Sequence, residues 1–412
     1  MSIDIQNIRV LSTAEKFSLT GLIVGIGIGL LYILPPEFLG FNPTAFAWIM
    51  PLIVSLIVIL SNASKITFPF KIWIPWIVWT GLYMLVSHEK NALQRTVMLH
   101  TGVVIGIAFS TFRPNLYFLD IFAKGMRAYF FAILLLGFFS MSLGFNSTSD
   151  SNAGNFAAGA TTATLISVWF VGRYSIGYSK SLFNYVLLGL VPYLCNTRMG
   201  MFAVAMVFPL TFGPIGLKKR LASLLVIICL GLLAFKTEHV QSKMFYSGHG
   251  DYSDLFQGIA NLVSGSESDT SASDFATNGR KSIAIALEDG LRAHYWMGNG
   301  ANTTEAISFE VAGVTHPHND WLRIQYEYGT VGVIIFICTL ILQIRSAYKV
   351  KQYAPPKIAI PYYCLGAGAF IPMIFFMLSD NILLYVGWYG NVQFAALGLY
   401  YGITSFYKNA SK

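Results

Sequence analysis

The residues best suited to do chemistry are two histidines and an Asn-Asp pair in the segment His-Pro-His-Asn-Asp. An imidazole titrates near neutral pH and can accept a proton from a hydroxyl group. Asn319 and Asp320 are good caps for a helix that continues into a long apolar run. We therefore expect His316 and His318 to lie just before a helix that enters a membrane. Metal chelation by the two histidines and a purely structural helix cap are the alternatives.

Two arginines complete the set of candidate residues. Arg198 lies between two apolar runs, and Arg280 opens the amphipathic stretch 280–294. A guanidinium group is always charged and grips phosphate oxygens with two parallel hydrogen bonds, and the first turn of a helix offers backbone N–H groups to the same anion. The alternatives are an Arg198 that snorkels to lipid headgroups and a solvated surface Arg280.

The composition determines where these residues must sit. Of the 412 residues, 55% are hydrophobic and only 11% are charged, with a mean hydropathy of +0.59. An ordinary soluble domain has about 25% charged residues. A soluble enzyme, a disordered chain and a disulfide scaffold are therefore excluded. The sequence predicts an all-α integral membrane protein. Its net charge of +8 is explained better by a basic face against anionic lipid than by nucleic-acid binding.

About 20 apolar residues are needed for one membrane-spanning helix, and about twelve runs are candidates. These runs are 18–35, 44–61, 70–87, 97–112, 126–145, 156–172, 182–197, 199–217, 221–235, 329–345, 358–378 and 382–404. Most of the 27 Lys and Arg residues fall on one side if the N-terminus faces the cytoplasm. Because basic residues mark cytoplasmic loops, we expect both termini there.

The chain is predicted to have three parts. Residues 1–235 form an N-terminal bundle of about nine helices, 236–327 form one large periplasmic loop with short helices, and 328–412 form about three further helices. In the loop, Ile283, Leu287 and Leu291 make one apolar helix stripe. No Gly-rich nucleotide loop follows a strand, so the sequence favours outer-face chemistry on an anionic, membrane-borne substrate.

Three segments resemble the bacterial O-antigen ligase/polymerase superfamily, which includes the protein O-oligosaccharyltransferases. NTRMGMF (196–202) resembles its Ser-Arg-Gly-type element, with Thr197 where the family often has Ser. NGRKSIAIALEDG with MGNG (278–300) is similar to the loop element that carries an arginine, a helix and a Gly-x-Gly turn. HPHNDWLRIQYEYGTVG (316–332) resembles the His-Asn-x-x-Leu…Glu-x-Gly-x-x-Gly signature.

The resemblance implies a glycosyltransferase of the bacterial inner membrane that acts on the periplasmic side without a metal or cofactor. Its donor would be an undecaprenyl-diphosphate-linked glycan. By matching positions, Arg198 and Arg280 would hold the diphosphate and His318 would activate the acceptor hydroxyl. His316 and Asn319 would help to orient the site.

The acceptor decides the activity within this family. A polymerase extends a lipid-linked repeat unit, a ligase transfers the glycan to lipid A–core, and an oligosaccharyltransferase transfers it to protein. The run HNDWLRIQYEYG favours a polymerase slightly. A transporter of lipid-linked glycans is the alternative from another class, but the two halves show no repeat.

Overall fold

The computed structural model describes residues 13–29, 46–112, 116–142, 150–245, 247–254 and 280–411. Within these ranges the chain is all-helical and has no β-strand, as the sequence predicts. Of the loop expected over 236–327, residues 246 and 255–279 lie outside the described part of the chain.

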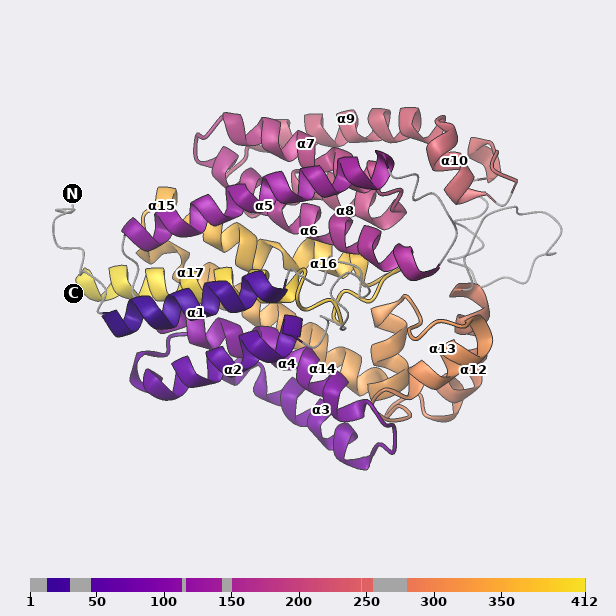
Figure 1. The fold of residues 1–412 in the computed structure, drawn as a ribbon, viewed down its shortest axis with the longest axis horizontal. Helices are drawn as coiled ribbons and strands as arrows, with labels where there is room; N and C mark the ends of the chain where they lie inside the picture. The colour runs from indigo at the N-terminus through magenta and orange to yellow at the C-terminus, as the bar shows by residue number, and fades with distance from the viewer. Residues whose placement is uncertain are drawn as a thin grey trace.

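The helices are arranged in two groups along the chain (Figure 1). Before the loop lie α1 (Thr13–Gly29), α2 (Phe46–Ser61), α3 (Ile74–Val86), α4 (Ala92–Ser110), α5 (Leu116–Ser142), α6 (Asp150–Ser175), α7 (Lys180–Leu194), α8 (Arg198–Val207) and α9 (Leu217–Phe235). From the loop onward lie α10 (Glu238–Met244), α12 (Arg280–Ala293), α13 (Thr303–Ala312), α14 (Asp320–Val350), α15 (Pro356–Tyr363), α16 (Phe370–Phe376) and α17 (Gly390–Ala410). A helix overlaps each of the predicted apolar runs.

Two of the predicted runs have wrong boundaries. The run 199–217 is helical only as far as Val207, because Pro209 and Pro214 follow and lack the backbone N–H groups that a helix needs. The last run was expected to begin at residue 382, but α17 begins at Gly390. The chain from 377 to 389 forms turns instead, and this segment contributes to the candidate site described below.

Three described helical stretches are long and apolar enough to cross a membrane: Ala92–Ser110, Asp320–Tyr353 and Pro356–Phe376. Trp48–Ser61, Ile74–Val86 and Arg198–Val207 are shorter apolar helices. Large apolar side chains such as Leu60 and Leu85 are exposed on the outer helices, as expected where lipid replaces water. The protein is a helical membrane protein, and the number of twelve spans stays a prediction.

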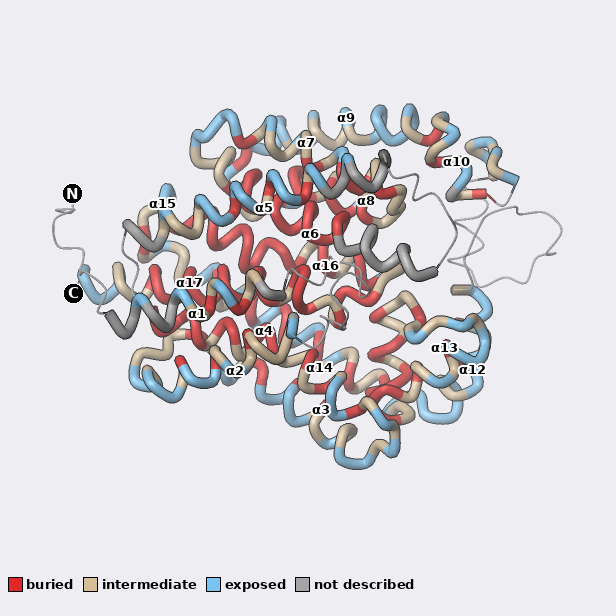
Figure 2. Tube along the Cα trace, viewed as in Figure 1, coloured by how far each residue is buried: buried red, intermediate tan, exposed pale blue. Residues whose placement is uncertain are grey.

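The centre of the molecule is formed by α4, α6, α17 and the segment from α15 to α16 (Figure 2). Helices α4 and α17 approach closely because small residues line their interface. A Cβ at Gly398 would overlap the carbonyl oxygen of Gly106, and a Cβ at Gly102 would lie 2.7 Å from the Phe394 ring. Such small residues are typical of helix contacts in membranes, where close backbone approach drives packing.

The two ends of the molecule differ in what they contain. The beginning of α1 and the end of α17 lie at one end of the long axis, and α10, α12 and α13 lie at the other (Figure 1). This separation is what the predicted topology requires of a loop that faces away from both termini. The assignment of the two ends to cytoplasm and periplasm stays a prediction.

Helix α14 is broken at Gly329, which has φ 70° and ψ 177°. The break frees two N–H groups and two carbonyls, and the turn after α12 takes up all four. Thr330 N–H donates to the Tyr295 carbonyl at 3.0 Å, and Val331 N–H donates to that of Trp296 at 3.2 Å.

The reverse hydrogen bonds run from the same turn to the first part of α14. Asn299 N–H donates to the Tyr326 carbonyl at 2.8 Å, and Gly300 N–H donates to that of Glu327 at 3.0 Å. In an unbroken helix, these carbonyls would bond the N–H groups four residues on. The turn 295–300 thus replaces two helical hydrogen bonds of α14 with four of its own.

Side-chain packing adds to this backbone joint. Ile283 and Leu287 of α12 form a small separate core with Tyr326 of α14, and Leu291 packs against its edge. The predicted apolar stripe on α12 is therefore confirmed. It fixes the loop helices to the first part of α14.

Candidate active site

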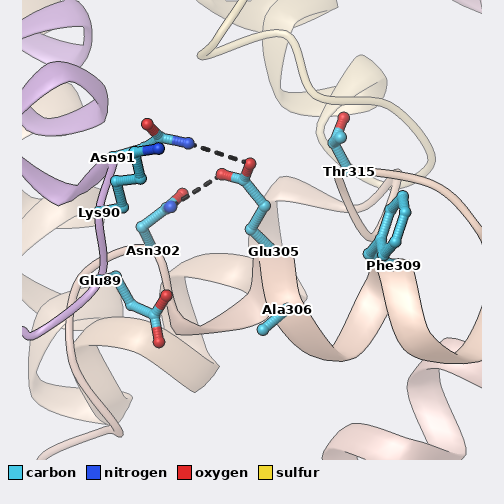
Figure 3. A pocket seen from close by; sticks show the side chains of 8 residues that line it. All are labelled: Glu89, Lys90, Asn91, Asn302, Glu305, Ala306, Phe309 and Thr315. Atoms are coloured by element: carbon cyan, nitrogen blue, oxygen red, sulfur yellow. Dashed lines mark hydrogen bonds between the residues drawn. The ribbon is translucent and has the colours of Figure 1, made fainter.

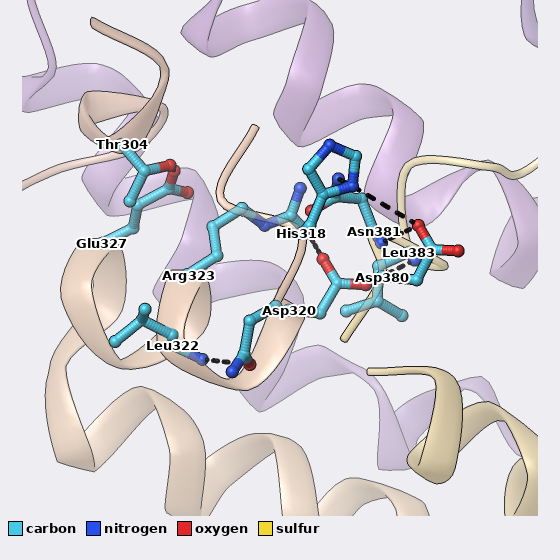
Figure 4. Close-up of polar contacts among 10 residues, drawn as sticks. Thr304, His318, Asp320, Leu322, Arg323, Glu327, Asp380, Asn381 and Leu383 are labelled. Carbon is cyan, nitrogen blue, oxygen red and sulfur yellow. Dashed lines mark hydrogen bonds and ion pairs between the residues drawn. The ribbon is translucent and has the colours of Figure 1, made fainter. Parts of the chain in front are cut away.

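His318 lies in the short segment between α13 and α14, with its side chain about one third exposed. Its φ of 50° is unusual for a residue other than glycine and indicates a backbone held in place by its surroundings. Its Nδ1 lies 3.8 Å from Oδ1 of Asp380 and 3.3 Å from the side-chain amide of Asn381 (Figure 4). The Nδ1 side of the ring thus contacts the segment that precedes α17.

The amide of Asn381 can hold one tautomer of this ring. Asn381 is fully buried, and its Oδ1 has no hydrogen-bond partner among the described atoms. Exchanging the amide oxygen and nitrogen gives Oδ1 a donor, the Nδ1–H of His318. In that arrangement Nε2 carries the lone pair and is the basic nitrogen.

Arg280 is also affected by the charge of Asp380. It is the first described residue of α12, and its Nε is buried without a hydrogen-bond partner among the described atoms. Burial lowers the pKa of the guanidinium, whereas the nearby Asp380 and Tyr385 raise it. Asp380 thus acts electrostatically on Arg280 and lies 3.8 Å from His318, so it links these two predicted site residues.

A buried row of charged side chains on α14 positions the segment around Asp380. Asp320 and Arg323 form an ion pair at 3.0 Å, with side chains only 0% and 6% exposed. Oδ2 of Asp320 accepts the N–H of Leu383 at 2.8 Å (Figure 4). Asp320, in the first turn of α14, thereby fixes the turn that contains Asp380 and Asn381.

The same face of α14 reaches the loop helix α13. Thr304 donates its hydroxyl to Oε1 of the buried Glu327 at 2.6 Å. Asp320, Arg323 and Glu327 are spaced by three and four residues, so their side chains share one face of the helix. This polar face connects α13 to the turn before α17.

His316 differs sharply from His318 in its surroundings. Burial lowers its pKa to about 2, and the positive charges of Arg95 and Arg323 act in the same direction. A histidine in this environment stays neutral and is a poor proton acceptor near neutral pH. Between the two histidines, His318 is the better candidate for a base.

Asn319 performs the structural role expected of it. It is the N-cap of α14, and its Oδ1 accepts the N–H of Leu322 at 3.0 Å. This hydrogen bond fixes where the helix begins, and so fixes the residue next to His318.

Arg198 is the first residue of α8, directly after the N-cap Thr197. Gly200 lets this helix start press against its neighbours, because a Cβ there would lie 2.8 Å from Ala160 on α6 and 3.0 Å from Pro192 on α7. One turn on, the Phe202 ring packs edge-on against Phe375 at 5.1 Å.

Phe375 lies on α16, five residues before Asp380. Helix α8 is therefore packed against the element that leads into the site. Direct proximity of Arg198 to Arg280 and His318 stays a prediction.

Sequence reasoning missed Asp380 and Asn381. They lie 62 and 63 residues after His318, in the polar tripeptide Ser-Asp-Asn between two apolar runs. A carboxylate and an amide in a short turn expected at the outer face were the available signal. The sequence did not indicate that this turn meets the histidine segment.

Within the described ranges, no three His, Cys, Asp or Glu side chains gather as metal ligands would. His316 and His318 are instead surrounded by arginines, an amide and one nearby carboxylate. The arrangement suits an anionic group held by guanidinium groups better than a cation. Metal independence stays a prediction.

Residues 183–337 match the family model described as O-antigen ligase. Residues 183–337 thus form a domain of the O-antigen ligase/polymerase superfamily. The resemblance stated from its motifs is thereby confirmed. No curated protein matches the chain.

The region matched by the O-antigen ligase family model includes Arg198, Arg280, His316, His318 and Asn319. It ends before Asp380 and Asn381, which only the fold places beside His318. The superfamily is one of glycosyltransferase-type enzymes, so this cluster of cations, imidazole and carboxylate is a candidate active site.

Proposed function

We propose that this chain is an inner-membrane glycosyltransferase that transfers a glycan from undecaprenyl diphosphate on the periplasmic side. The observation that supports this most directly is the meeting of Arg280, His318 and Asp380 at one end of the helical bundle. A diphosphate leaving group needs fixed positive charge, and a sugar hydroxyl needs a base. Both requirements are met within one cluster.

In the proposed reaction, His318 Nε2 takes the proton of an acceptor hydroxyl. The acceptor oxygen bonds to the anomeric carbon while the bond from that carbon to the diphosphate oxygen breaks. The electron pair of the broken bond stays on the lipid diphosphate, and Arg280 and Arg198 stabilise that charge. Fixed guanidinium groups in a site poor in water are effective here because they need no reorganisation during the reaction.

Asp380 would act as a positioning residue for the imidazole and would stabilise its protonated form. A direct displacement of this kind inverts the configuration at the anomeric carbon. A positioned base typically contributes about 10²–10⁴-fold to the rate. His316, which stays neutral, and Asn319, which caps α14, would support the site without taking the proton.

Polymerisation of surface-polysaccharide repeat units is the preferred activity within the family. O-antigen ligation to lipid A–core and transfer to protein use the same donor and are the alternatives. Deletion of the gene separates the first two: single repeat units on the core indicate a polymerase, and long chains that stay on their lipid carrier indicate a ligase.

The decisive experiment is transfer by the purified protein in detergent from a defined lipid-diphosphate-linked glycan to each acceptor class. Transfer without a membrane gradient would exclude pure transport. We expect the activity to persist in excess chelator and the product to be inverted. A product with retained configuration, or loss of activity with the chelator, would contradict the mechanism.

A further inference from the structure

A hollow lies between the α3–α4 connection and the loop helix α13, on the α13 side of the histidine segment (Figure 3). Glu89, Lys90 and Asn91 line one wall, and Asn302, Glu305 and Phe309 line the other. Its walls thus come from two parts of the chain that are about 210 residues apart, and the mechanism above uses none of these side chains.

The floor of the hollow is held rigidly by Glu305. Its Oε1 accepts from the Asn91 amide at 3.3 Å, and its Oε2 accepts from the Asn302 amide at 2.8 Å. Arg95 pairs with the same carboxylate at 3.7 Å. These contacts hold both amides in place and offset the charge of one of the two acidic residues.

The rim offers a different set of groups. Among the described residues, no side chain hydrogen-bonds to the carboxylate of Glu89 or the ammonium of Lys90. On the opposite wall, Phe309 is 63% exposed (Figure 3). Hydrogen-bonding groups of both kinds beside one exposed aromatic face suit a sugar, which has hydroxyl groups at its edge and C–H groups on its faces.

The charge of the hollow distinguishes it from the diphosphate site. Glu89 opposes Lys90, and Glu305 opposes Arg95, so no excess of positive charge is available for a pyrophosphate. A diphosphate would meet carboxylates here, whereas Arg280 does not line this hollow.

The hollow is close to the proposed base. Thr315 lines it, and three residues of chain span at most about 11 Å, so the hollow and His318 are within reach of one short glycan. Arg95 links the two places physically, because it pairs with Glu305 and its charge also acts on His316.

We propose that this hollow binds a sugar of the acceptor and presents the next hydroxyl to His318. The inference rests on the proposed glycosyltransferase function and adds to it the location of the acceptor subsite. Glu89 and the two asparagines would bind hydroxyl groups, and Phe309 would pack against a sugar face.

The test uses the full-length protein in detergent, with a lipid-diphosphate-linked repeat unit as donor and acceptor concentration as the variable. Glu89→Gln, Asn91→Ala and Phe309→Ala should each raise KM for the acceptor about tenfold. The donor KM and kcat at saturating acceptor should stay within about twofold of the wild type. Phe309→Tyr should keep the wild-type acceptor KM, because it retains the aromatic ring.

The matched controls, Glu310 and Val311, lie on α13 next to Phe309 but do not line the hollow. Glu310→Gln removes the same charge as Glu89→Gln, and Val311→Ala shortens an exposed apolar side chain as Phe309→Ala does. Both should leave the acceptor KM unchanged. Thermal unfolding of each variant identifies any change in KM that comes from a damaged fold.

A binding measurement separates the two proposals. The probe is the repeat-unit oligosaccharide released from its lipid, which carries no diphosphate. It should bind the wild type and His318→Ala equally and bind Phe309→Ala about tenfold more weakly.

If the wild type transfers glycan but the hollow variants keep the wild-type acceptor KM, the acceptor subsite is wrong and the function stands. If the probe binds in the hollow but no donor and acceptor pair reacts, the glycosyltransferase function is wrong.

Discussion

Gly298 and Gly329 face each other so closely that neither can carry a side chain. A Cβ at Gly298 would lie 2.5 Å from the backbone nitrogen of Gly329, and a Cβ at Gly329 would lie closer still to the carbonyl oxygen of Trp296. Both have positive φ, 79° and 70°. The two glycine-containing motifs of the sequence, MGNG and EYGTVG, are therefore two halves of one joint.

Alanine at either glycine should separate the loop helices from α14. We expect Gly298→Ala and Gly329→Ala each to cost more than about 2 kcal/mol in the free energy of unfolding, because each combines a left-handed backbone with backbone overlap. Thermal unfolding and transfer activity in detergent measure the effect. Gly313→Ala is the control, since Gly313 has φ 67° but open space around it. A similar loss at all three positions would mean that backbone strain alone is responsible.

Removal of the proposed base should abolish transfer and leave the fold intact. His318→Ala should lower kcat about 10²–10⁴-fold, because the acceptor hydroxyl then loses its proton acceptor. The exposed His294 offers a matched control, and His294→Ala should keep wild-type activity. Equal damage from His316→Ala and His318→Ala would reopen the choice between the two histidines.

Loss of the carboxylate beside the imidazole should lower the rate without weakening donor binding. Oδ1 of Asp380 lies 3.8 Å from Nδ1 of His318 and positions the ring, so Asp380→Asn should reduce kcat about tenfold and leave the donor KM within about twofold of the wild type. Steady-state kinetics with the purified enzyme would measure both. A matching loss of thermal stability would assign Asp380 a structural role only.

The guanidinium groups should not be replaceable by simple positive charge. We expect Arg280→Ala and Arg198→Ala to lose transfer about 100-fold or more, and the corresponding Lys variants to recover little of it, because an ammonium cannot make the two parallel hydrogen bonds. Arg292→Ala, on the exposed face of α12, is the control. Full activity of Arg280→Lys would show that charge alone is needed.

Stability should fall in mild acid because His316 stays neutral in the folded protein. Its ordinary pKa is 6.5 and its folded pKa is about 2, so below pH 6.5 the unfolded chain binds a proton that the folded chain does not. Stability is therefore lost as pH falls, by about 2 kcal/mol between pH 7 and 5.

Denaturant unfolding at pH 7, 6 and 5 would measure this loss, and His316→Asn should reduce its slope. The exposed His294→Asn should leave the slope unchanged. A steep loss that persists in His316→Asn would place its origin elsewhere.

Local patterns in the sequence predicted much of this molecule. The apolar runs mark the helices, Asn319 caps α14, and the spacing of Ile283 and Leu287 marks the buried face of α12. Each of these features is determined within a few residues of chain. They could be recognised because helix periodicity and capping are local effects.

What could not be predicted depends on contacts across long separations. The meeting of His318 with Asp380 and Asn381 is set by the Asp320–Arg323 pair and the Leu383 amide, not by any local signal. The break in α14 is similar: an isolated glycine in an apolar run indicates nothing about a turn 30 residues away that fills the break. The hollow beside α13 likewise needs the α3–α4 connection from the other half of the chain.

The interrupted ladder of α14 has a mechanical consequence. Straightening this helix would remove all four backbone hydrogen-bond partners of the 295–300 turn at once. Arg280 is on α12, and His318 directly precedes α14. Because this joint connects the two helices, a shift of one residue should be accompanied by a shift of the other. Any movement that admits a bulky lipid-linked glycan must therefore occur elsewhere in the protein. The turn 295–300 and the first part of α14 should move together as one rigid unit.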